Sequence, residues 1–217
     1  MAFLIVKEES VKAEGGSGYV TKSGIYDMTL RHTEVKNTPN GAVQVNYLFD
    51  KAMSYGNTIV GVNGQPTFGY KIIESLASVL GHEELSDPEP TTVTFKKGAK
   101  ELSCIPELND VQVKAWVQVG YRMYKDEITE DVAVRRFYRV SDGATGSEIL
   151  TGEDIGSRLE KDQVVASEIK YEDGITPEDV AAWKKSQQTG GGGTPAAKPA
   201  AGGFPGNKAK VGFPGGK

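Results

Sequence analysis

Alternating hydrophobic and polar residues mark the first part of the chain as β structure. A period of two is typical of a strand that buries one face. Residues 25–35 show this pattern first. After a turn signal at Asn40-Gly41, residues 42–49 show it again, with apolar side chains at Val43, Val45, Tyr47 and Phe49. Residues 57–62 add a third short candidate, so we predict three consecutive strands.

The period changes to that of a helix over residues 71–80. The apolar positions there fall on one helical stripe: Ile72, Ile73, Leu76, Ala77 and Leu80. Gly81 follows at the position where a helix usually ends in a left-handed glycine. Strand patterns then return over residues 91–95, 111–123 and 132–140.

Three strands, one helix and further strands is the order of the OB-fold, a partly open five-stranded barrel. The predicted fold class is therefore mainly β: an OB-fold-like five-stranded barrel with one helix between strands three and four, a C-terminal helical extension and a disordered tail. The predicted divisions are a flexible arm (residues 1–19), the OB-like domain (residues 20–150), an acidic extension (residues 151–188) and the tail (residues 189–217).

The predicted extension contains two helices and a strand. Residues 151–160 suggest a short helix, and residues 164–171 suggest a strand. Thr176 and Pro177 suit the N-cap and first position of a last helix that reaches Lys185. Its expected contacts with the body are Val180, Ala181 and Trp183.

The tail has the composition of a disordered segment. Residues 189–217 hold ten glycines and four prolines, and such a segment cannot offset the entropy of ordering. Its only aromatic residues are Phe204 and Phe213, each inside a Gly-Phe-Pro-Gly repeat. We interpret these two rings as contacts for a partner protein. A plain linker-like end is the alternative.

Charge is unevenly distributed along a chain whose net charge is −4. Residues 94–140 carry nine Lys/Arg and seven Asp/Glu, whereas residues 141–185 carry five and eleven. The basic residues thus gather in the segment that also holds many aromatics. Overall acidity does not exclude nucleic-acid binding, because phosphates respond to the local potential, which is screened over ~8 Å.

Few residues suit metal or redox chemistry. Cys104 is the single cysteine, and we expect it to be reduced and buried in a strand. His32 and His82 lie too far apart to form a metal-ligand spacing, so we expect neither metal nor cofactor. No stretch approaches the ~18 apolar residues of a membrane span, and no signal peptide is apparent. These features predict a cytoplasmic protein.

The sequence offers little for catalysis. It has no Ser/His/Asp spacing of a nucleophilic triad and no phosphate-binding loop. The acidic run at residues 83–89 falls in a predicted loop and is typical of solvated surface. We therefore do not expect an enzyme.

The basic and aromatic run at residues 134–140 is the main candidate for binding. In a regular strand, Arg135, Phe137 and Arg139 share one face and Arg136 and Tyr138 the other. Because a barrel strand buries one face, one set should meet an anion. Arginine contacts phosphates, and aromatic rings stack on bases. In the alternative interpretation the rings are core and the arginines pair with Glu127, Glu130 or Asp131.

Other basic and aromatic residues extend this candidate DNA-binding set. Tyr47 is equally suited to the core. The full set is Arg31, Lys36, Tyr47, Tyr55, Tyr70, Lys96, Lys97, Lys100, Trp116, Arg122, Tyr124, Arg135, Arg136, Tyr138 and Arg139.

Several segments together resemble bacteriophage single-stranded-DNA-binding proteins, over roughly residues 20–160. The likeness lies in Lys22-Ser23-Gly24-Ile25-Tyr26, in Gly41-Ala42-Val43, in Gly69-Tyr70 at a helix start and in Leu80-Gly81 at its end. The resemblance implies an OB-fold that coats single strands in phage replication and recombination. It also implies a tail that recruits replication proteins, although the family's tail is acidic and this one is basic.

The expected function is sequence-tolerant binding of single-stranded DNA in the host cell cytoplasm. Its expected partners are that DNA and, through the tail, replication proteins, with no membrane; the sequence also allows a homodimer. A protein-interaction or assembly module with a docking tail is the alternative.

Overall fold

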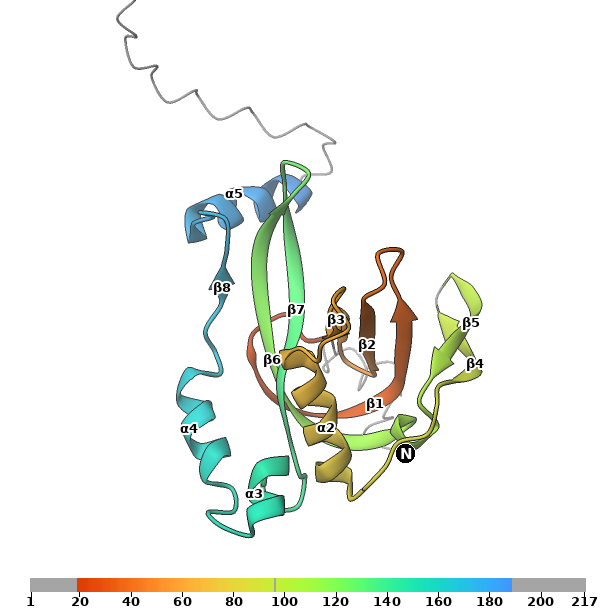
Figure 1. Cartoon of the computed structure of the whole chain (residues 1–217). Helices are drawn as coiled ribbons and strands as arrows, with labels where there is room; N and C mark the ends of the chain where they lie inside the picture. The colour runs from red at the N-terminus through yellow and green to blue at the C-terminus, as the bar shows by residue number, and fades with distance from the viewer. Residues whose placement is uncertain (1–18, 96, 189–217) are drawn as a thin grey trace, which may run out of the picture.

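The computed structural model describes residues 19–95 and 97–188 (Figure 1). The predicted arm up to residue 18, the whole predicted tail with Phe204 and Phe213, and Lys96 lie outside the described residues. The elements of the body are β1 (Gly24–Asn37), β2 (Val43–Phe49), β3 (Met53–Val60), α2 (Phe68–Leu80), β4 (Glu89–Phe95), β5 (Gly98–Cys104), a 3₁₀ turn η1 (Pro106–Leu108), β6 (Val111–Tyr124) and β7 (Glu127–Tyr138).

Strand β1 is shared by the two halves of a barrel-like sheet. Its residues 24–30 pair with β6, and its residues 30–37 pair with β2, both antiparallel. Antiparallel pairs β2–β3 and β6–β7 extend the sheet on the two sides. Strand β3 then lies against β7 without a ladder between them, so the barrel is partly open. The predicted fold class, mainly β with one helix after the third strand, is confirmed.

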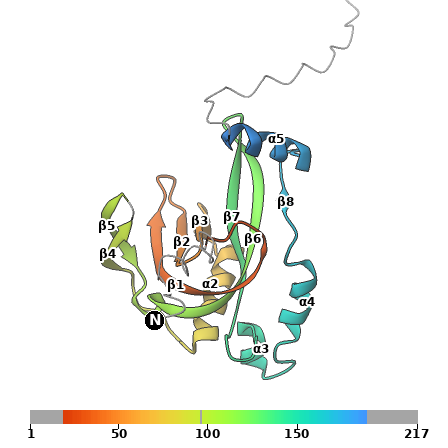
Figure 2. The ribbon, with the colours of Figure 1, turned by 180° about the vertical axis from the view of Figure 1, so that it is seen from behind.

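The β4–β5 hairpin lies outside the barrel. It pairs along its whole length with itself, and it joins β1 through the Glu34–Cys104 pair. The predicted strand at residues 91–95 thus belongs to an inserted hairpin that stands apart from the barrel strands (Figures 1 and 2). Cys104 is buried, as expected.

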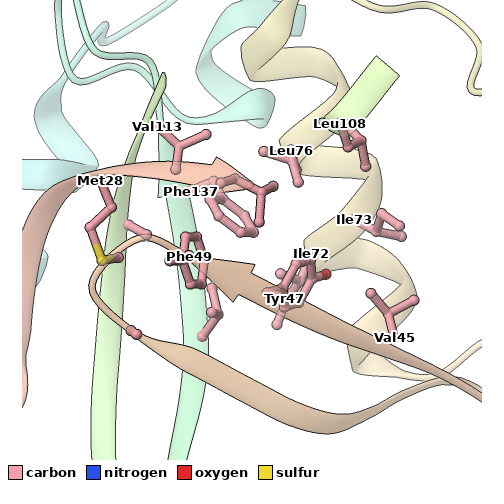
Figure 3. Packing of buried hydrophobic residues seen from close by; sticks show 14 of the residues in the cluster. Met28, Val45, Tyr47, Phe49, Ile72, Ile73, Leu76, Leu108, Val113 and Phe137 are labelled. Atoms are coloured by element: carbon pink, nitrogen blue, oxygen red, sulfur yellow. The ribbon is translucent and has the colours of Figure 1, made fainter. Parts of the chain in front are cut away.

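One face of α2 covers the barrel core. Thr67 accepts a hydrogen bond from the Gly69 N–H at the helix start, and Gly81 ends the helix at φ +80°. Gly69 must lack a side chain, because a Cβ there would lie 2.3 Å from the Thr58 carbonyl oxygen. The predicted stripe is confirmed in its centre, where Ile72, Ile73 and Leu76 face the core rings Tyr47, Phe49 and Phe137 (Figure 3).

The β6–β7 hairpin is longer than the sequence suggested. The strand patterns end at residue 123 and resume at residue 132, but the turn between the strands is only Lys125-Asp126, with φ of 51° and 63°. Positive φ at both central residues matches the right-handed twist of the strands they join. Residues 127–131 therefore belong to β7, where Ile128 packs inward.

After β7 the chain forms α3 (Gly146–Thr151), and the acidic extension then forms α4 (Ser157–Val165), β8 (Lys170–Tyr171) and α5 (Pro177–Gln188). The predicted helix at residues 151–160 is displaced, since it overlaps α4 only over residues 157–160, and only residues 170–171 of the predicted strand at residues 164–171 form a strand. A capping box between Thr145 and Glu148 starts α3 earlier. Left-handed residues at Gly152 and Gly156 then interrupt the helix before α4 begins.

The last helix packs on the β6–β7 hairpin. Thr176 caps α5 reciprocally with Asp179, which confirms the predicted N-cap. Val180 and Trp183 form a second hydrophobic cluster with Val119 and Tyr121 of β6. Ala181, the third expected contact, is exposed. No helix within residues 19–95 and 97–188 is long and apolar enough to cross a membrane.

Candidate nucleic-acid interface

A β-bulge in β7 changes the predicted faces of the Arg-rich run at Arg135, whereas Arg136 and Tyr138 share one face as predicted. The pairing passes from Trp116–Arg136 to Val117–Val134, so Arg135 is an extra residue on β7. As a result Val134 and Phe137 both face the core, at 2% and 0% exposure. Arg135 and Phe137 therefore do not share a face.

Tyr138 and Arg136 are engaged inside the protein and do not form a binding surface. Tyr138 is fully buried, and its hydroxyl donates to Asp162 Oδ2 of α4 at 2.8 Å. Burial raises the pKa of Tyr138, and the hydrogen bond to Asp162 raises it further. Arg136 Nε lies 2.8 Å from the same carboxylate oxygen, an ion pair without hydrogen-bond geometry. Tyr138 cannot stack on a base, and the charge of Arg136 is matched.

Two further predicted arginines are also paired. Arg139 donates to Asp142 through Nε at 2.9 Å and through Nη2 at 2.5 Å. Arg31 donates to Asp110 at 2.8 Å. The alternative interpretation, in which the arginines pair with carboxylates, thus holds for Arg136 and Arg139. Their partners are Asp162 and Asp142 and not the three carboxylates that the sequence suggested.

Tyr47 was also wrongly assigned to the binding set, since it belongs to the core. Its side chain is 1% exposed, and its ring centroid lies 5.4 Å from that of Phe137. The hydroxyl has no hydrogen-bond partner among the described residues. Burial raises the pKa of this phenol.

An exposed tyrosine remains on the outward side of the neighbouring strand β3. Tyr55 is 53% exposed and precedes Gly56, whose φ is +70°. The Gly56 N–H donates to Asn46 Oδ1 at 2.8 Å, and Asn57 Nδ2 donates to the Val45 carbonyl at 3.1 Å. Side-chain hydrogen bonds from β2 and β3 therefore fix the irregular backbone that presents the Tyr55 ring to solvent.

A buried carboxylate organises the same surface. Glu34 of β1 is 4% exposed; it accepts a hydrogen bond from Asn46 Nδ2 at 2.6 Å and pairs with Lys36 at 3.1 Å. Asn46 thus links Glu34 to the Gly56 backbone. Partial burial raises the pKa of Tyr55, and the nearby charge of Glu34 raises it further. We call this surface the Tyr55 face, formed by Glu34, Lys36, Gln44, Asn46, Tyr55 and Thr58.

Other basic and aromatic residues lie around or beyond the Tyr55 face. Tyr19 is 46% exposed, and its electrostatic coupling to Tyr55 places the two phenols near each other. On the β4–β5 hairpin, Lys97 and Lys100 are exposed and form no ion pair with any described residue. Sequence reasoning missed Tyr19 because it fell within the predicted arm.

The remaining predicted aromatics are scattered. Tyr70 is 37% exposed in the first turn of α2, and Tyr124 is 58% exposed at the tip of the β6–β7 hairpin. The Lys125 ammonium lies 5.3 Å from the Tyr124 ring centroid. Trp116 is half-buried on β6, and its indole N–H has no partner among the described residues. These rings do not form one continuous platform with Tyr55.

Arg122 and Arg135 are brought together on the outward side of β6 and β7. They line a hollow with Lys170 of β8 and Gln118 of β6. Sequence reasoning missed Lys170 because its position depends on the parallel pairing of β8 with β6. Within residues 19–95 and 97–188, no three His, Cys, Asp or Glu side chains are grouped to hold a metal.

No family model and no curated protein matches this chain.

Proposed function

We propose that this protein is a non-catalytic, sequence-tolerant binder of single-stranded DNA, which it contacts through the Tyr55 face. The observation that carries the proposal is the fixed, exposed Tyr55 ring on the β2–β3 side of an OB-like barrel. OB-folds bind oligonucleotides on that side. Following the resemblance, we place this activity in phage replication or recombination in the host cytoplasm.

Stacking supplies the sequence tolerance in this proposal, since every base has a π-face. Because side-chain hydrogen bonds fix the backbone that carries the Tyr55 ring, less freedom is lost when a base stacks on it. The exposed amines of Lys36, Lys97 and Lys100 supply charges for the phosphates. Because Lys36 already forms an ion pair with Glu34, we expect modest affinity for single-stranded DNA, with a clear salt dependence.

Fluorescence anisotropy with labelled oligothymidine tests the proposal. Loss of one stacking ring in Tyr55→Ala should weaken binding by about 1–3 kcal/mol, or about 5- to 150-fold. Tyr55→Phe keeps the ring and should bind close to wild type. Absence of binding at low salt, or equal binding by wild type and Tyr55→Ala, contradicts the proposal.

The second candidate is a protein-interaction module. It is favoured by apolar side chains on the helices that follow β7, where Leu150 of α3 and Val164 of α4 are each 81% exposed. The same titration separates the two functions. An interaction module should not bind oligothymidine at any salt concentration, whereas the DNA-binding protein should bind it most tightly at low salt.

A further inference from the structure

A hollow of about 220 Å³ lies on the outward side of the β6–β7 hairpin, next to β8. We call it the Gly120 hollow. Its cationic side chains are Arg122, Arg135 and Lys170, and its acidic ones are Asp131 and Glu172. The three cations come from three different strands, so the cluster exists only because β8 pairs with β6.

Two small residues make the hollow. Gly120 lies between Gln118 and Arg122 on the outward side of β6, and Ala133 pairs with Gln118 across the hairpin. A Cβ at Gly120 would lie 3.5 Å from the Lys170 carbonyl oxygen. The absent side chain at Gly120 therefore leaves open space between the side chains of Gln118 and Arg122, next to the point where β8 pairs with β6.

The two guanidinium groups have free donors. The bulge keeps Arg135 on the outward side, where its Nε donates to Gln118 Oε1 at 2.7 Å. Neither Nη group of Arg135 has a hydrogen-bond partner among the described residues. Arg122 is exposed and forms no hydrogen bond or ion pair with any residue in those ranges. By contrast, each of Arg31, Arg136 and Arg139 is paired with a carboxylate.

One carboxylate already faces all three cations. Glu172 pairs with Lys170, and this hydrogen bond lowers the pKa of Glu172, with smaller contributions from the charges of Arg122 and Arg135. Asp131 instead accepts a hydrogen bond from the Val132 N–H at 3.0 Å. The hollow thus holds three cations and two carboxylates, and the guanidinium donors of Arg122 and the Nη groups of Arg135 stay available to an anion with several oxygens.

We propose that the Gly120 hollow binds a phosphate group of the nucleic-acid strand and that Glu172 competes with this phosphate for the three cations. The source of the phosphate rests on the proposed function. In the sheet order β3-β2-β1-β6-β7, residues 30–37 of β1 belong to the Tyr55 side and residues 24–30 pair with β6, which carries the hollow. A DNA strand that contacts both surfaces therefore passes over β1, from its β2-paired half toward its β6-paired half.

Oligothymidine titrations over a series of NaCl concentrations test this site. For single strands, log K falls with log salt at a slope of about −0.7 for each phosphate contact. Arg122→Gln and Arg135→Gln should each reduce the slope by about 0.7. Glu172→Gln should tighten binding by about two- to fivefold at low salt, as expected for removal of one exposed competing charge. Lys161→Gln, which removes a cation from the exposed side of α4, is the matched control and should change neither quantity.

A second measurement separates the site from the proposed function. Inorganic pyrophosphate is added to ¹⁵N-labelled protein without DNA, and the Nε–Hε signals of Arg122 and Arg135 are followed by NMR. Shifts of both signals that Glu172→Gln strengthens, with normal oligothymidine binding, support a strand phosphate in the hollow. The same shifts without any oligothymidine binding assign the hollow to a free phosphate compound and overturn the proposed function. Oligothymidine binding with unchanged slopes in both arginine variants overturns the site and leaves the proposed function standing.

Discussion

The Tyr138 hydroxyl donates a hydrogen bond of 2.8 Å to Asp162 Oδ2, which joins the outward side of β7 to α4. Asp162 is 2% exposed and also faces the guanidinium groups of Arg136 and Arg158. A single buried carboxylate thus connects the barrel with the acidic extension. The outward face of this part of β7 is occupied by the protein itself.

Asp162→Asn should lower the free energy of unfolding by about 3 kcal/mol. Removal of one charge from a buried ion pair leaves its partners uncompensated, although Arg136 keeps some contact with water. Urea denaturation at pH 7 measures the effect. Asp142→Asn breaks an exposed pair, which contributes little to stability, and should cost much less than Asp162→Asn. Equal losses in the two variants would contradict the structural importance of Asp162.

Tyr47→Phe should leave stability unchanged or raise it by about 1 kcal/mol. The variant removes a buried hydroxyl that has no partner among the described residues, whereas Tyr138→Phe takes a donor from Asp162 and should cost about 1–3 kcal/mol. Thermal or urea unfolding separates the two. Affinity for oligothymidine should not change in Tyr47→Phe, and a clear loss would return Tyr47 to the binding surface.

Glu148 should make stability depend on pH. Its burial alone would raise the pKa of Glu148, but hydrogen bonds from the Thr145 and Arg158 N–H groups, together with two hydroxyls, lower it below 4.5. A carboxyl whose pKa is lower in the folded state stabilises the protein above the unfolded pKa and loses this effect as pH falls through the folded one.

The pH dependence is measured by comparing wild type with Glu148→Gln. At pH 7 the variant should be less stable by about 1–2 kcal/mol, because it loses the charged cap. The difference should shrink as pH falls below 4.5. A constant difference from pH 7 to pH 3 would show that the charge of Glu148 does not contribute.

Gly56→Ala should weaken DNA binding beyond its effect on stability. Both Gly56 and Gly64 have positive φ, +70° and +74°, so alanine at either position costs about 1–2 kcal/mol. Only Gly56 fixes the orientation of Tyr55. Oligothymidine affinity should therefore fall in Gly56→Ala and stay unchanged in Gly64→Ala. If both variants bind equally well, the backbone at Gly56 does not present a stacking ring.

The strands and α2 were predictable because their signals are local. The alternation in residues 42–49 and the helical stripe ending at Gly81 each reflect one buried face. The N-cap at Thr176 was likewise predictable, because it depends only on the residues that follow it directly in the chain. The Thr145–Glu148 capping box was also present in the sequence and could have located α3. The fold class follows from the order of these elements.

The candidate site was less predictable because it depends on register and on distant partners. One extra residue at Arg135 moved this side chain to the face opposite Phe137, and a period of two cannot reveal such a bulge. The carboxylates that pair with Arg31 and Arg136, at Asp110 and Asp162, are 79 and 26 positions away in the chain. No pattern within a short window could identify these partners.

Because α5 and β8 pack on Val119 and Tyr121, the acidic extension completes the folded body. A fragment that stops at residue 150 would expose both side chains and leave Tyr138 uncovered, and it should be prone to aggregation and proteolysis. Recombinant work on the barrel should therefore keep the chain at least through α5, and studies of the remaining C-terminal residues should begin truncation after position 188.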